Sequence, residues 1–194
     1  MEIFRNTRLK VGNVLLKKKS AKTRRKVFYS NIGLVKNIGI VWDASKPEDF
    51  QFLSKFYQKM HERNIEVKIF GYFPGKELPD KYTAIRYLTC IRKKELNFFY
   101  HPVSPETDTF IRNPYEILID INFKNLLPLR YISKLSAAKF KVGLFEAETI
   151  DTPFDLMMEI KYPVDIEDYL KQIIIYLEMI NSGDYIKANN YQIK

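Results

Sequence analysis

The chain has 194 residues, 46% of them hydrophobic, and a formal net charge of +9. This size and apolar content can bury one sizeable core, so we expect one domain with extensions. A single cysteine, Cys90, excludes an internal disulfide, and with only two histidines beside it the chain lacks the ligands for a structural zinc site. The longest apolar run near the start, residues 14–16, is too short for a signal-peptide core or a membrane span, so we expect a cytoplasmic location.

The positive charge is concentrated at the N-terminus, because the first 26 residues hold ten Lys or Arg and one acid, Glu2. In the rest of the chain, basic and acidic residues are equal in number, so their charges sum to zero. A basic segment of this kind attracts polyanions such as RNA, DNA or an anionic membrane. The side chains that we expect to contact phosphate are Lys17, Lys18, Lys19, Lys22, Arg24, Arg25 and Lys26.

The first half of this segment could form a basic amphipathic helix. On a helical wheel its apolar stripe would comprise Ile3, Phe4, Val11, Val14 and Leu15. Such a stripe could lie on an anionic membrane or dock in a groove. The second half, residues 17–26, is almost entirely polar, and for it a solvated tail that only keeps the protein soluble is the alternative to phosphate contacts.

The elements that follow alternate between strands and helices. Residues 37–43 form a continuous apolar run typical of a strand buried on both faces. Ser45, Pro47 and Glu48 then predict the start of a helix, whose inward side chains are Phe50, Leu53, Phe56 or Tyr57, and Met60. Asn64 is a plausible helix stop, and residues 65–72 alternate like a second strand. This strand–helix–strand pattern predicts a βαβ unit.

The second half is punctuated by prolines but repeats the pattern. We expect strands at residues 84–91, 96–100, 115–121, 140–145 and 154–160. Between Pro102 and Pro114 we expect mostly loop, with a short helix at best. Helices are predicted over residues 126–138 and after an N-cap at Asp165.

This order of elements predicts an α/β fold, a three-layer Rossmann-like sandwich with a mostly parallel sheet, preceded by a basic N-terminal arm. We divide the chain into a partly helical arm (1–34), an α/β domain (35–180) and a polar C-terminal tail (181–194).

Catalytic signals are sparse. The carboxyl ends of the predicted strands carry Asp43, Asp120, Asn122 and Glu146, which could form a cleft for a ligand or a carboxylate-dependent reaction. Capping or solvent exposure is the commoner role for acids after strands, so we expect no metal site and no cofactor. The chain contains neither G-x-G-x-x-G nor G-x-x-x-x-G-K-[ST], and no serine elbow accompanies His101. We therefore expect a protein that is not an enzyme.

Several segments resemble a family of small Bacteroidetes proteins that carry a domain of unknown function. The resemblance spans nearly the whole chain and implies a fold without an activity. The segments that carry it are residues 92–99, 117–122, 128–132, 138–143 and 154–157. Residues 115–160 are also similar, more loosely, to the acceptor half of heptosyltransferase-like GT-B glycosyltransferases, whose sugar-nucleotide domain this chain is too short to contain.

These observations predict a non-enzymatic protein that binds RNA through phosphate contacts of its arm, with ribosomal RNA as one candidate. A protein of the inner membrane surface is the first alternative, with the arm lying on anionic lipid. A small enzyme or ligand-binding protein that uses the strand-end cleft is the second.

Overall fold

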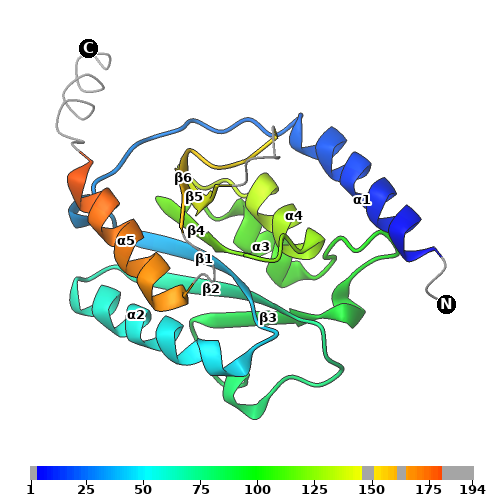
Figure 1. Cartoon of the computed structure of the whole chain (residues 1–194), viewed down its shortest axis with the longest axis horizontal. Helices are drawn as coiled ribbons and strands as arrows, with labels where there is room; N and C mark the ends of the chain where they lie inside the picture. Colours follow the sequence, from blue (N-terminus) through cyan, green and yellow to red (C-terminus); the bar gives the residue numbers. More distant parts are fainter. Residues whose placement is uncertain (1–3, 146–150, 161–164, 181–194) are drawn as a thin grey trace.

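The centre of the molecule is a six-stranded sheet in which every strand pair is parallel (Figure 1). The structure, a computed structural model, describes residues 4–145, 151–160 and 165–180. The strands are β1 (Asn37–Asp43), β2 (Glu66–Phe73), β3 (Leu88–Arg92), β4 (Ile117–Ile121), β5 (Phe140–Leu144) and β6 (Leu156–Met158). The predicted α/β class with its parallel sheet is confirmed.

The strand order is β3-β2-β1-β4-β5-β6. The chain builds outward from β1 to β3, then returns to place β4 on the other side of β1. In doubly wound folds with this order, ligands bind outside the carboxyl ends of the two central strands, where the winding direction reverses. The position to inspect for a site is therefore the edge beyond β1 and β4.

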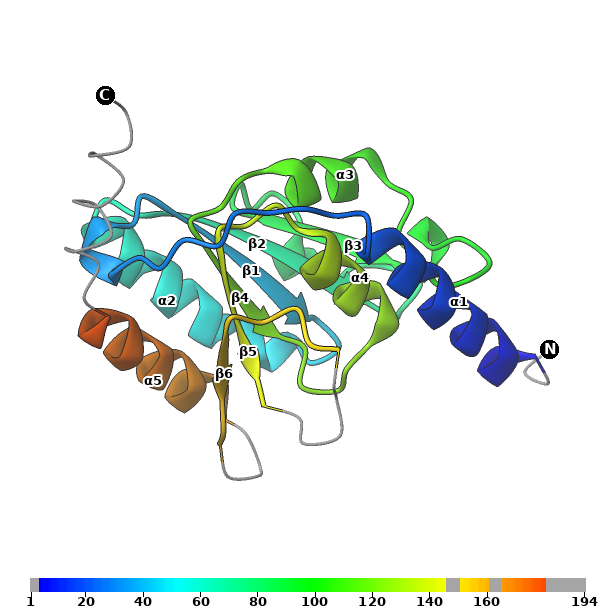
Figure 2. The same ribbon diagram turned by 90° about the horizontal axis from the view of Figure 1, so that it is seen from above.

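Helices cover both faces of the sheet and make the three layers of the sandwich (Figure 2). Helices α2 (Phe50–Glu62) and α5 (Ile166–Met179) pack on one face, and α3 (Pro105–Arg112) and α4 (Leu127–Leu135) on the other. The larger core lies under α2 and α5, where Trp42 and Tyr169 are fully buried. The smaller core packs Phe70 and Leu118 of the sheet against α3 and α4.

The ends of the helices follow local chemistry. Asp165 caps α5 by accepting a hydrogen bond from the Asp168 amide at 3.0 Å, as predicted. Asn64 ends α2 with a positive φ of 58°, a conformation that Asn tolerates well. Ser45 is not a cap, because α2 begins only at Phe50 after a 3₁₀ turn over Pro47–Asp49. The predicted inward residues Phe50, Leu53, Phe56 and Met60 are buried.

The predicted strand at residues 96–100 is wrong. Beyond one isolated bridge from Leu96 to Pro102, this stretch is a turn. Asn97 explains the difference, because its side-chain oxygen accepts hydrogen bonds from the amides of Phe99 (2.9 Å) and His101 (3.0 Å). An Asn that bonds to amides farther along its own chain closes a turn, and this bonding outweighs the strand preference of the aromatic residues.

The N-terminal segment contains helix α1 (Arg5–Ser20), which packs outside α4 and extends beyond the sheet (Figure 1). Leu16 is 1% exposed and packs with Leu127, Tyr131 and Leu135. The Gly12 carbonyl lies 2.9 Å from the His101 ring nitrogen Nε2. The helix is therefore part of the packed structure rather than a solvated tail.

The buried face of α1 is not the apolar stripe that the helical wheel predicted. Phe4, Val11, Val14 and Leu15 face solvent, with 38–68% of their surface exposed. Gly12 decides the orientation, because its missing side chain allows α1 to approach closely, and a Cβ there would lie 2.5 Å from the Phe99 carbonyl oxygen. Within the described residues, no helix is long and apolar enough to cross a membrane.

Candidate functional site

Three of the hollows at the carboxyl edge of the sheet bear on the predicted site, and the predicted cleft residues are divided between two of them. Asp120 and Asn122 line the first hollow, beside α4, and Asp43 lines the second, beside α2 and α5. Glu146 lies outside the described residues. The structure therefore does not bring the predicted acids to one point.

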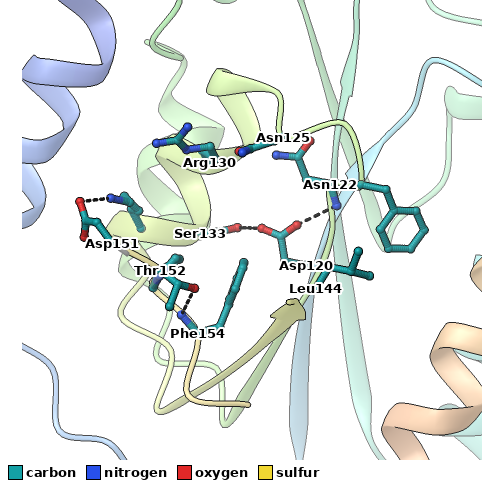
Figure 3. Close-up of a pocket in the computed structure, with 12 residues that line it drawn as sticks. Asp120, Asn122, Asn125, Arg130, Ser133, Leu144, Asp151, Thr152 and Phe154 are labelled. Carbon is teal, nitrogen blue, oxygen red and sulfur yellow. Dashed lines mark hydrogen bonds and ion pairs between the residues drawn. The ribbon is translucent and has the colours of Figure 1, made fainter. Parts of the chain in front are cut away.

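Asp120 is 5% exposed, and its hydrogen-bond partners are groups of the protein itself that hold the local structure (Figure 3). Its carboxylate accepts hydrogen bonds from the Asn122 amide at 2.7 Å and from the Ser133 hydroxyl, which points directly at it. The Tyr169 hydroxyl donates to its carbonyl at 3.1 Å. The hollow beside it measures about 40 Å³, room for a few waters and too small for a substrate.

Asn122 closes the loop between β4 and α4. Its side-chain oxygen accepts a hydrogen bond from the Leu126 amide at 2.8 Å, and its side-chain nitrogen donates to the Leu126 carbonyl at 3.1 Å. Both polar ends of the amide are thus occupied by the backbone of one residue. This arrangement positions α4 and leaves little capacity for a ligand.

Asp43, at the end of β1, lines the second hollow, which measures about 380 Å³. Its carboxylate accepts a hydrogen bond from the Ser45 amide at 3.0 Å and pairs with Lys124 at 2.9 Å. Asp49 lines the same hollow, and its pKa is raised mainly by burial, against the lowering effect of Lys46. Across the described residues, no group of three or more His, Cys, Asp or Glu side chains is arranged to hold a metal ion.

The third hollow is the largest, a cleft of about 720 Å³ between α1, the end of β2 and the loop from β4 to α4. Four of its side chains are cationic, namely Arg5, Arg8, Lys93 and Arg130. Among the described residues that line it, none is acidic. We call this hollow the cationic cleft.

Only part of the cationic cleft could have been found from the sequence. Lys93 directly follows β3. Functional groups often lie at the carboxyl ends of parallel strands, and applying this rule to bases as well as acids would have identified Lys93. Arg130 lies in the first half of α4, where nothing in the sequence distinguishes it from an ordinary surface arginine. Arg5 and Arg8 belong to the basic segment but reach the cleft only because α1 docks.

The predicted phosphate-contacting residues differ in what they do. Lys17, Lys18, Lys22, Arg24 and Lys26 are exposed, and none of them forms an ion pair with another described residue. Arg25 instead pairs with Asp155 at 2.6 Å and donates to the Lys139 carbonyl at 3.1 Å. Lys19 donates to the Tyr131 hydroxyl and lies 4.8 Å from the centre of that ring.

Lys141, Cys90 and His101 are among the buried or partly buried groups whose pKa values are shifted. Burial lowers the pKa of Lys141 to about 7 and raises that of the Cys90 thiol to about 12, which makes this thiol a poor nucleophile. Burial also lowers the pKa of His101, against the opposing hydrogen bond to the Gly12 carbonyl. None of the three lines the cationic cleft.

The fold and the cleft define a doubly wound α/β protein with a hollow of about 720 Å³ that is lined by bases and lies at the carboxyl edge of its sheet. Residues 8–180 match the sequence model of a family of unknown function, DUF6913, and the chain belongs to this family. No curated protein matches the chain. The match covers α1 from Arg8 onward together with the α/β domain, so most of the docked helix lies within the matched residues.

Proposed function

We propose that the protein binds RNA through a surface formed by the C-terminal half of α1 and the chain that follows it. The observation that supports this proposal is a set of exposed cations on a segment that is anchored at both ends. The cations are Lys17, Lys18, Lys22, Arg24 and Lys26. None of the five forms an ion pair with another described residue, although Lys17 lies close enough to Asp151 to help lower the pKa of that carboxyl. Their charges are therefore available to phosphate.

The anchoring matters because it reduces the entropy that binding must overcome. Leu16 holds α1 on α4, and the Phe28 amide donates to the Lys139 carbonyl at 3.1 Å. Between these two contacts Arg25 forms an ion pair with Asp155, while its neighbours Arg24 and Lys26 are exposed. Cations held in fixed positions lose less freedom on binding than those of a loose tail.

RNA binding through phosphate contacts should fall steeply with salt, because each contact releases condensed counterions. If all five exposed cations engage single-stranded RNA, the log–log salt slope should be roughly −3.5, from about 0.7 per contact. Replacing all five with Gln should remove most of this slope. The melting temperature should change little, because these side chains are solvated in the free protein.

A matched control replaces five exposed lysines elsewhere with Gln, which lowers the net charge equally: Lys36, Lys55, Lys59, Lys76 and Lys94. Fluorescence anisotropy with a labelled oligonucleotide, between 50 and 300 mM salt, should show weakened binding only for the first variant. The proposal is overturned if both variants bind as the wild type does. Equal weakening by both would indicate a general charge effect and would overturn the assignment to this surface.

Binding to an anionic membrane is a second candidate, and the exposed stripe of α1 is the observation that favours it. Phe4, Val11, Val14 and Leu15 face solvent beside Lys10 and Lys18, a combination typical of helices at the membrane interface. Phe4→Glu with Leu15→Glu should release the protein from anionic liposomes in a sedimentation assay. RNA binding should survive, because these residues do not contact phosphate in the first proposal.

A further inference from the structure

The cationic cleft carries four positive charges that the proposed RNA surface does not use. Arg5 and Arg8 come from α1, Lys93 from the turn after β3, and Arg130 from α4. None of the four forms an ion pair with another described residue. Four like charges around one hollow repel one another, and an anion in the hollow would relieve this repulsion.

The walls of the cleft are fixed by packing rather than by the charges themselves. The Arg8 Nε atom donates to the Phe98 carbonyl at 2.7 Å, and its guanidinium lies 4.2 Å from the Phe98 ring centre and 4.6 Å from that of Tyr100. Arg130 lies on α4, whose Leu127 and Tyr131 hold α1 in place. The Arg8 guanidinium is thus held at the hollow before any ligand arrives, which favours affinity.

The size and lining of the cleft indicate what it would hold. A volume of about 720 Å³ falls in the range of small-molecule sites and exceeds what a single phosphate ion needs. Besides the bases, the lining supplies the side-chain amides of Asn13 and Asn125, the rings of Tyr72 and Tyr100, and apolar surface from Leu126 and Leu127. The lining therefore combines groups that bind phosphate with groups that accept a ring or a sugar.

The cleft lies at the carboxyl edge of the sheet, between the end of β2 and the loop that follows β4, and no described residue of β1 lines it. The position where the winding reverses, at the ends of β1 and β4, belongs to the second hollow, which Asp43 and Ile121 line. The cationic cleft therefore lies beside that position. The first turn of α4 lines it as well, and the positive end of that helix dipole adds to the attraction for an anion.

From the charge, the size and the position of the cleft, we propose that it binds a small phosphorylated ligand of the nucleoside di- or triphosphate class. The phosphates would contact Arg5, Lys93 and Arg130, and the ring would lie toward Tyr72 and Tyr100. This site is separate from the exposed cations proposed for RNA, so either proposal can fail without the other.

Isothermal titration calorimetry of the full chain tests the proposal with ADP, ATP, pyrophosphate and adenosine as probes. We expect saturable binding of ADP or ATP, weaker binding of pyrophosphate and no binding of adenosine. Lys93→Gln and Arg130→Gln should each weaken ADP or ATP binding at least tenfold, because each removes a charge-assisted contact. Lys94→Gln is the matched control, since this neighbour of Lys93 does not line the cleft, and it should bind as the wild type does.

Thermal melting of each variant without ligand shows whether the fold is intact, and a variant that melts early is replaced by Lys93→Met or Arg130→Met. Absence of binding by all the phosphorylated probes at millimolar concentration would overturn the proposal. Equal affinity in Lys94→Gln and Arg130→Gln would also overturn it. If the cleft variants weaken only RNA binding, the cleft is an extension of the RNA surface and the small-ligand proposal is wrong.

Discussion

Lys141 shows how a single residue can carry a stability cost that the sequence does not reveal. Its side chain is 1% exposed, and its ammonium nitrogen donates to the Ser133 carbonyl at 2.7 Å and to the Lys134 carbonyl at 3.3 Å. Burial and, to a smaller extent, nearby Arg25 lower its pKa to about 7, against the opposing effect of Asp155 and Asp120. A lysine in an unfolded chain has a pKa near 10.4.

Between about pH 7 and pH 10, therefore, the unfolded chain holds a proton at Lys141 that the folded protein lacks. The free energy of unfolding should rise with pH in this window, by up to about 1.4 kcal/mol per pH unit. Well below pH 7 this residue should cause no such rise, because Lys141 is then protonated in both the folded and the unfolded chain. Urea unfolding at pH 7, 8 and 9 should show this slope in the wild type and a flatter one in Lys141→Met. The Met variant also loses two hydrogen bonds, but that loss does not depend on pH. Parallel pH curves for the two proteins would contradict the prediction.

At the scale of elements, the docking of α1 rests on which of two adjacent leucines is buried. Leu16 is 1% exposed against α4, whereas Leu15 is 38% exposed. Leu16→Ala should cost about 2–5 kcal/mol of the free energy of unfolding if α1 unfolds together with the body, because it leaves a cavity. Leu15→Ala should cost less than about 1 kcal/mol.

Urea unfolding of the two variants, followed by circular dichroism, measures this difference. The two variants are a matched pair, because each replaces a leucine by alanine in the same helix. Equal small effects would show that α1 does not contribute to the cooperative unit. Trypsin cleavage at Lys17–Lys19 gives an independent measurement, since an undocked helix should be cut faster.

The apolar stripe on the helical wheel is not the face of α1 that docks on α4, and there is a physical reason for this. The apolar residues of this helix are spread around its circumference, so the pattern does not single out one buried side. The close contact at Gly12 with the Phe99 carbonyl, together with the bond from its own carbonyl to His101, then selects the docked face. Both partners lie about 90 residues away in the sequence.

At the scale of the whole molecule, the structure bears on what happens when residues 1–26 are removed. Neither of the two main cores contains a residue of this segment, so the α/β body should still unfold cooperatively. The deletion uncovers Leu127, Tyr131 and Leu135 and removes the Arg25 partner of Asp155. The melting temperature should therefore fall by roughly 5 °C or more, since 1 kcal/mol corresponds to about 2–4 °C in a protein of this size.

Differential scanning calorimetry of the deletion variant, beside a shorter deletion of residues 1–4 that leaves most of α1 in place, measures this fall. Binding of a hydrophobic dye should increase only in the longer deletion, where the face of α4 is bare. An unchanged melting temperature would show that α1 docks without contributing stability. Loss of any cooperative transition would show that α1 is required for the body to fold.

The sequence by itself determined the α/β class, the parallel sheet and most of its elements. Buried parallel strands read as continuous apolar runs, as in residues 37–43, and helix caps such as Asp165 act on amides only a few residues away. The predicted strand at residues 96–100 failed where the local signal was itself ambiguous, because aromatic residues favoured a strand and Asn97 formed a turn.

Only the tertiary structure decided which polar side chains meet. Asp43 and Asp120 follow the same strand-end rule, yet they line different hollows because β1 and β4 present them beside different helices. Arg5, Arg8, Lys93 and Arg130 come from three separate stretches of chain and meet because α1 docks on α4. Such a cleft depends on long-range packing, and charge along a sequence carries no information about which distant segments will share a surface.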